Sequence, residues 1–185
     1  SVFEADGVAA GEPGEGDVCA KGFYTVGPQG QIPAGLYYLE GSNEKLSHYY
    51  VFDGDDGRYS LDDSVQYFGN YFVELEEGAV FAWDAPDGLR LYPAADASFE
   101  PTAPYRSGLY RVGEDIPAGT YTVTIEPEAA AEADNECGAF VMRDLAFGSG
   151  SITDEKYVVR GSSQTVTVKD GDWLELYAAT AAPAQ

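Results

Sequence analysis

The side chains that most often carry catalysis are scarce in this chain. Its 185 residues include one histidine, His48. A serine hydrolase would need His48 as its base, and the glycine-serine run at 147–151 lacks the Gly-x-Ser-x-Gly spacing. Carboxylates are abundant, but a glycosidase must hold two of them across a cleft, for which small modules leave little room. We therefore predict no catalytic residues and a protein that is not an enzyme.

One acidic run has the composition of a calcium loop. Asp53, Asp55 and Asp56 offer carboxylate oxygens close together in the chain, and Ca²⁺ takes about six to eight oxygen ligands. Gly57 and Ser64 fall where an EF-hand requires ligands, so the run does not follow that pattern. The alternative, which we prefer, is an acidic turn, where Asp and Gly are favoured for backbone reasons. Ca²⁺ is the one cofactor that the sequence suggests.

Aromatic side chains are the more informative candidates for binding. Neighbouring residues of a strand face opposite sides of a sheet, so an aromatic doublet cannot bury both rings in a one-sided core. Such doublets occur in the first half of the chain, at 37–38, 49–50, 67–68 and 71–72. The ring left outside could stack on a sugar or form a hot spot for a protein partner. Alternatively, it is covered by another part of the chain.

The N-terminal segment and the cysteines raise a question of compartment. Residues 1–20 are rich in Gly, Ala and acids and read as an acidic tether or an arm laid on a neighbouring surface. Cys19 lies at the end of this segment and Cys137 in the second half of the chain. In an oxidising compartment the two could form one disulfide that pins the segment, and otherwise they are two unpaired thiols.

The charge balance excludes some partners. Acids outnumber bases 32 to 10, which gives a formal net charge of -22. Nucleic acid is excluded as a partner, because phosphate binding needs clustered Lys and Arg. The chain also has no run of about 18 apolar residues, so no transmembrane segment is expected. A surface protein or a glycan stays open as a partner.

An internal duplication organises the elements that must position these residues. The segments GFYTVGPQGQIPAGLY (22–37) and GLYRVGEDIPAGTY (108–121) both read Gly-x-Tyr-x-Val-Gly, a spacer, then Ile-Pro-Ala-Gly-x-Tyr. VELEEGAVFAW (73–83) aligns with VTVKDGDWLEL (166–176), and 50–52 falls opposite 140–142. The unit is about 85 residues long and occurs twice.

The pattern inside each unit indicates short strands and tight turns. Alternating apolar residues and the Ile-Pro-Ala-Gly corners predict a hairpin near each corner, and Asp170-Gly171 predicts another between 165–168 and 173–177. The fold class is therefore all-β, with two tandem, antiparallel, jelly-roll-like β-sandwich units. Unit 1 is expected over 21–97, a linker over 98–104 and unit 2 over 105–185. Whether the units share one core stays open.

The duplication also assigns faces to the aromatic residues. Matching each strand with its counterpart places Tyr37, Tyr50, Phe52 and Tyr71 inside. The aromatic residues predicted to stand on outer faces, and therefore to form a binding surface, are Tyr38, Tyr49, Phe72, Trp173 and Tyr177.

The repeated Tyr-x-Val-Gly…Ile-Pro-Ala-Gly-x-Tyr pattern resembles a repeat of uncharacterised secreted proteins and lipoproteins of Gram-positive bacteria. More loosely, it is similar to jelly-roll modules appended to secreted peptidases and glycosidases. The resemblance implies a small β-sandwich module and an extracellular or cell-surface location, and it brings no catalytic residues.

These observations favour a non-catalytic binding or display module of a bacterial cell surface. The alternatives are a carbohydrate-active enzyme or its accessory carbohydrate-binding domain, and a Ca²⁺-stabilised adhesin.

Overall fold

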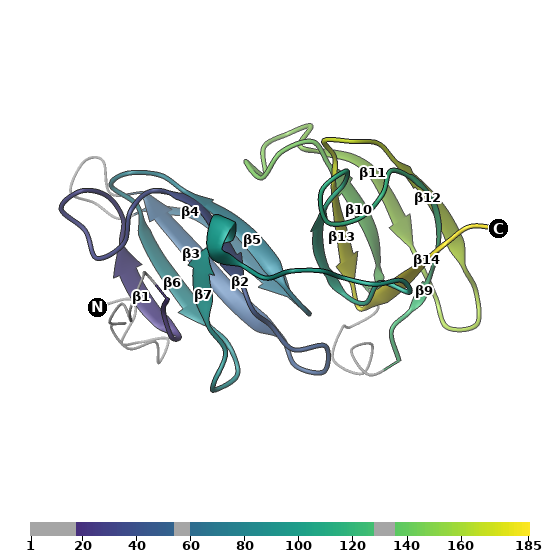
Figure 1. The fold of residues 1–185 in the computed structure, drawn as a ribbon, viewed down its shortest axis with the longest axis horizontal. Coiled ribbons are helices and arrows are strands. Elements are labelled where there is room, and N and C mark those ends of the chain that lie inside the picture. Colours follow the sequence, from purple (N-terminus) through teal and green to yellow (C-terminus); the bar gives the residue numbers. More distant parts are fainter. Residues whose placement is uncertain (1–17, 54–59, 128–135) are drawn as a thin grey trace. The chain divides into compact units, whose positions relative to one another are not determined.

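The computed structural model describes residues 18–53, 60–127 and 136–185 (Figure 1). Within these ranges the regular structure is almost entirely β-strand, and the one helical turn is a 3-10 turn at Ala94–Asp96. The all-β prediction is confirmed. No helix among the described residues has the length and apolar character needed to cross a membrane.

The contacts between Cα atoms divide the chain into two compact units. Unit 1 comprises the described residues up to Gly41 together with Leu46–Tyr67 and Phe72–Ala97. Unit 2 comprises Ser98–Gln185, apart from the residues not described, and two short segments from earlier in the chain, Ser42–Lys45 and Phe68–Tyr71. These two segments lie far from the rest of unit 2 in sequence.

Unit 1 is built from a four-stranded sheet, ordered β1-β6-β3-β4, and a three-stranded sheet, ordered β5-β2-β7. The pairs with a described register are antiparallel. The strands are β1 (Gly22–Thr25), β2 (Gly35–Leu39), β3 (Ser47–Asp53), β4 (Ser60–Tyr67), β5 (Tyr71–Leu75), β6 (Val80–Asp84) and β7 (Leu91–Pro93).

Unit 2 repeats this topology strand for strand. Its sheets are ordered β8-β13-β10-β11 and β12-β9-β14. Each strand number is seven higher than that of its counterpart in unit 1. The duplication predicted from the sequence is therefore present in the fold. The strands are β8 (Gly108–Arg111), β9 (Gly119–Ile125), β10 (Gly138–Met142), β11 (Ile152–Tyr157), β12 (Gln164–Val168), β13 (Trp173–Tyr177) and β14 (Ala179–Pro183).

The predicted hairpins at the Ile-Pro-Ala-Gly corners are wrong. β1 pairs with β6 and β2 pairs with β7, so each corner carries the chain from one sheet to the other. A tight hairpin needs a turn with positive φ at its first central residue, and Pro33 and Pro117 fix a negative φ there. In each unit the chain closes a short parallel bridge before the corner, Val26 to Ile32 and Val112 to Ile116.

The hairpin predicted at Asp170-Gly171 is wrong for a similar reason. β12 and β13 belong to different sheets. The Gly171 N–H donates to the Val112 carbonyl oxygen at 3.0 Å, and the Val112 N–H donates to the Asp172 carbonyl oxygen at 2.9 Å. The turn therefore bonds to the end of β8 instead of closing on itself. The same two bonds recur in unit 1, where Gly78 and Ala79 bond to Val26.

The repeated tyrosines are held in the same way in both units. Each hydroxyl donates to the backbone carbonyl oxygen four residues earlier, as in the tyrosine corners of other sandwiches. The pairs are Tyr24 with Ala20, Tyr37 with Pro33, Tyr110 with Arg106 and Tyr121 with Pro117. These bonds explain why the repeat keeps tyrosine and not phenylalanine at these positions.

The interiors of the two units use the same positions with side chains of different size. Tyr49, Phe81 and Trp83 lie inside unit 1, and their counterparts in unit 2 are smaller, for example Leu174 and Leu176. The Trp83 indole N–H donates to the Tyr67 hydroxyl at 2.8 Å, so the polar atom of this large ring is satisfied in the core.

The two cysteines lie in different units, and both are buried. A disulfide between them would join the two units, and it stays a prediction. The Cys19 backbone exchanges two hydrogen bonds with Leu91, and burial raises the pKa of the Cys137 thiol. Each cysteine is thus packed as a small apolar residue of its own unit. Most of the acidic segment 1–20 lies outside the described residues.

Candidate ligand-binding site

The outward aromatic residues of unit 1 pack against one another. On the outer face of the three-stranded sheet, Tyr38 meets Phe72 edge to face at 5.4 Å and stacks on Tyr92 at 5.7 Å. The outward orientation of Tyr38 is confirmed, since Tyr37 and Leu39 are buried on either side of it. Phe72 has no exposed surface, so the expectation that its ring is exposed is wrong. The Tyr92 hydroxyl, in turn, donates to Glu40.

The orientation predicted for Tyr49 is also wrong. Tyr49 is fully buried against Phe81, whereas Tyr50 and Phe52 lie on the opposite face of β3. The match of 50–52 with 140–142 was in the correct register. The error lay in the choice of the inward residue, because Phe140 and Met142 occupy the outer face and Val141 the inner one. The outer face of this sheet carries its own apolar cluster, so side-chain type alone does not identify the core face.

In unit 2 the predicted orientations of β13 are confirmed. Leu174 and Leu176 are buried, and Trp173 and Tyr177 lie half-buried on the other face. The Tyr177 ring packs on Phe68, with centroids 5.3 Å apart. Tyr177 is therefore part of the packing of the 68–71 segment, and Trp173 is the better candidate for contact with a ligand.

Trp173 lines an open hollow of about 380 Å³ at one end of unit 2. The hollow is formed by the turn after β8 and the turn before β13. Its other lining residues are Arg111, Val112, Gly113, Glu114, Asp170, Gly171 and Asp172. Arg111 lies directly across from Trp173 in the β8–β13 ladder. We call this feature the Trp173 hollow.

An ion-pair cluster forms one wall of the Trp173 hollow. Asp115 accepts hydrogen bonds from the Arg111 backbone N–H, Nε and Nη2 at 2.8 to 2.9 Å, and its carboxylate is almost fully buried. Glu114, which is mostly exposed, lies 3.0 Å from Arg111 Nη1. The hydrogen bond to Asp115 raises the pKa of Arg111. The guanidinium is therefore fixed in place by its own neighbours.

The opposite wall carries two further carboxylates. Asp172 Oδ2 accepts the Lys169 backbone N–H at 3.0 Å and so shapes the turn. Asp170 lies so close to Gly113 that a Cβ at that position would stand 2.9 Å from its Oδ1. Gly113, with φ +94°, thus makes room for the Asp170 carboxylate at the mouth of the hollow.

The two units share the backbone arrangement around the Trp173 hollow, but the side chains at these positions differ. The strand register pairs Thr25 with Val80 in unit 1 and Arg111 with Trp173 in unit 2. Asp172 likewise corresponds to Ala79, by the shared turn bonds. Sequence reasoning missed Arg111, Glu114, Asp115 and Asp170. The signal that could have found them was the difference between the copies, not their similarity.

Another hollow of about 390 Å³ in unit 2 is lined by Arg160, Ser162 and Thr124 among others. It has no aromatic wall and adjoins Pro127, beyond which the chain is not described until residue 136. We therefore do not treat it as the candidate site.

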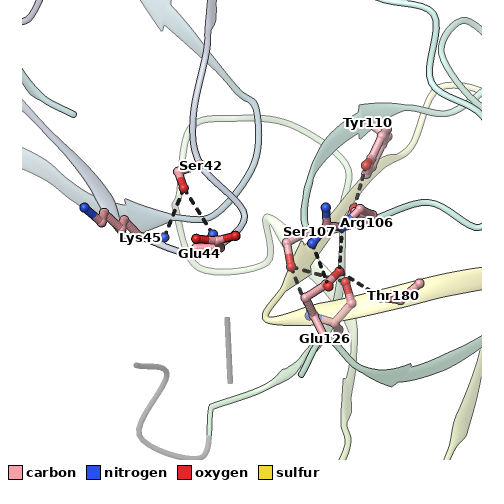
Figure 2. Close-up of polar contacts among 9 residues, drawn as sticks. Ser42, Glu44, Lys45, Arg106, Ser107, Tyr110, Glu126 and Thr180 are labelled. Carbon is pink, nitrogen blue, oxygen red and sulfur yellow. Dashed lines mark hydrogen bonds and ion pairs between the residues drawn. The ribbon is translucent and has the colours of Figure 1, made fainter. Parts of the chain in front are cut away.

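Two other polar side chains, Glu126 and His48, make contacts within the fold. The buried Glu126 carboxylate accepts hydrogen bonds from Arg106 at 2.9 and 3.2 Å and from Thr180 at 3.0 Å (Figure 2). His48 lies on the outer face of β3, stacked on Tyr50 at 4.8 Å, and burial lowers its pKa. Neither is placed in a described hollow.

The proposed calcium ligands fall mostly outside the described residues. Asp53 ends β3, whereas Asp55 and Asp56 lie in the range 54–59, which is not described. Within the ranges that are described, no three Asp, Glu, His or Cys side chains gather as a metal site would require.

A scan against protein-family models and searches of curated proteins and of solved structures found no match to this chain.

Proposed function

We propose that this protein is a non-catalytic, extracellular binding module of a bacterial cell surface, and that the Trp173 hollow is its ligand site. The observation that carries the proposal is the contrast between the units. The two sandwiches have the same strand order and the same turn hydrogen bonds. Their side chains differ where the end of β8 meets the start of β13 in unit 2 and the end of β1 meets the start of β6 in unit 1. Only unit 2 places an indole ring, an arginine and several carboxylates there.

The chemistry of the hollow suits recognition better than catalysis. An indole face offers stacking area, and fixed carboxylates offer directional acceptors. Arg111 and Asp172 are both held by hydrogen bonds within unit 2, so the polar groups are positioned before a ligand arrives. The cell-surface location in this proposal rests on the resemblance of the Tyr-x-Val-Gly…Ile-Pro-Ala-Gly-x-Tyr repeat to secreted bacterial proteins.

The test is binding of the purified chain to a glycan array and to isolated cell-wall fractions. Trp173→Val, which installs the residue of unit 1, should abolish binding while leaving the melting temperature nearly unchanged. Tyr157→Val is the matched control, because Tyr157 is an exposed aromatic residue of the same unit outside the hollow. Equal loss with both variants, or retention with Trp173→Val, would contradict the assignment of the site.

A carbohydrate-active enzyme is the second candidate, and one observation favours it. Glu175 lies between Trp173 and Tyr177 on the outer face of β13, and burial raises its pKa to about 7. A general acid of a glycosidase has a raised pKa of this kind. However, the Tyr71 hydroxyl donates to Glu175 Oε2 at 3.1 Å, and Glu175 lines neither described hollow. Release of reducing sugar that Glu175→Gln abolishes would favour the enzyme.

A further inference from the structure

We propose that the Trp173 hollow recognises a ligand through a positively charged nitrogen, an alkylammonium group such as that of a lysine side chain or an unacetylated amino sugar. This inference rests on the proposed function and specifies the chemical class of the ligand.

The first step is that Arg111 is committed to its own neighbours. Asp115 binds Nε and Nη2, and Glu114 binds Nη1. An anionic ligand would have to displace a bidentate carboxylate that is already in place and almost fully buried. Arg111 therefore acts as part of the wall and does not offer its charge to an anion.

The second step is the balance of charge around the opening. Three carboxylates line the hollow, those of Glu114, Asp170 and Asp172, against the single positive charge of Arg111, which is already paired with Asp115. Lys169 is exposed on the adjacent turn and is not part of the lining. The field in the hollow therefore attracts a cation and repels an anion, in a chain whose net charge is already -22.

The third step is the indole ring. Trp is the best of the aromatic side chains at holding a cation over its face, and the attraction grows as the cation loses water. Trp173 is half-buried in the wall of an open hollow that also carries the acidic side chains. A ring and carboxylates together can hold an ammonium group and the carbon atoms next to it, whereas carboxylates alone would hold a metal ion equally well.

The experiment follows the tryptophan fluorescence of the full chain while a probe is added. The chain has two tryptophans, and Trp83 has no exposed surface, so a ligand in solution reaches only Trp173. One arm uses tetraglucosamine with its N-acetylated form as the uncharged control. The other uses Nα-acetyl-lysine amide with the Nα,Nε-diacetyl compound as its control. We expect a saturable change with a charged probe and little with its acetylated partner. For Trp173→Val, which lacks the reporting indole, binding is measured by isothermal titration calorimetry, and we expect none.

A charge variant and its matched control complete the design. Asp170→Asn should weaken binding of the charged probe roughly fivefold, the factor for unit charges about 4 Å apart in water. Glu77→Gln removes the same charge at the position of unit 1 that corresponds to Asp170, and it should leave the affinity unchanged.

The glucosamine and lysine arms distinguish an amino sugar from a peptide as the source of the ligand. They also distinguish failure of the charge requirement from failure of the proposed function. Binding in the lysine arm alone indicates a peptide, binding in the glucosamine arm alone an amino sugar, and both results support the inference. Equal binding of an acetylated probe, with loss in Trp173→Val, overturns the charge requirement and leaves the proposed function standing. No saturable change with either charged probe up to roughly 50 mM overturns this inference, while the glycan array separately decides the function.

Discussion

At the scale of single residues, Glu175 is a carboxylate on a surface that is mostly apolar. Its ladder partners are Leu109 on β8 and Phe140 on β10. Burial raises its pKa to about 7, and the hydrogen bond from Tyr71 opposes only part of that rise. The folded chain therefore holds this proton more tightly than the unfolded chain does.

This shift predicts a dependence of stability on pH. A raised carboxyl pKa contributes stability that is fully present below the unfolded value, near 4.5, and is lost as the pH rises through about 7. Glu175→Gln should remove that loss, which amounts to about 3 kcal/mol between the two limits. Urea unfolding of both proteins from pH 4.5 to 8 measures the difference. A difference between variant and wild type that does not change with pH would contradict the buried carboxylate.

At the scale of elements, the segment 68–71 shows how closely backbones approach in unit 2. The Leu109 N–H donates to the Asn70 carbonyl oxygen at 3.0 Å, and Asn70 Nδ2 donates to the Leu109 carbonyl oxygen at 2.6 Å. These bonds cover the edge of β8 that β13 leaves unpaired. Gly69, with φ +71°, lies in this contact.

The close approach makes Gly69 irreplaceable. A Cβ there would stand 1.7 Å from the Ser107 carbonyl oxygen, so Gly69→Ala must displace the segment. We expect a loss of about 3 kcal/mol or more in the free energy of unfolding. Gly171→Ala is the control, since Gly171 also has a positive φ but open space around its Cβ, and it should cost about 1 kcal/mol. Thermal unfolding followed by circular dichroism compares them, and equal losses would refute the steric argument.

The sequence predicts strands better than it predicts their partners. The strand expected at 173–177 matches β13, and the strand expected at 165–168 lies within one residue of β12. The hairpin predictions are wrong because turn residues such as Pro and Gly indicate only that the chain reverses direction. They do not indicate which sheet the next strand joins. The outward orientation predicted for Tyr49 is wrong because both faces of the four-stranded sheet in unit 1 carry apolar residues.

At the scale of the whole molecule, duplication was the most reliable signal. It predicted two sandwiches, and both carry the same seven strands in the same order. The candidate site was only partly predictable. Trp173 stood out by its place in the pattern, whereas the Arg111–Asp115 pair depends on how the turn after β8 folds back. That geometry comes from packing and is not visible in residue types.

The net charge of -22 belongs to the chain as a whole and predicts a response to salt. Asp87, Asp115 and Glu126 have ion-pair partners, but ten basic residues cannot neutralise 32 acidic ones. Screening of the remaining repulsion should raise the melting temperature by a few degrees between low salt and about 0.5 M NaCl.

Calcium separates this general screening from a specific site. If the run with Asp53, Asp55 and Asp56 is an acidic turn, CaCl₂ and MgCl₂ at equal ionic strength should raise the melting temperature equally, because both act only by screening. A calcium ligand set would instead add a concentration-dependent stabilisation of the folded state. An excess for CaCl₂ that chelator reverses, and that Asp55→Asn with Asp56→Asn removes, would establish the ion site. The same excess in the double variant would place the calcium elsewhere in the chain.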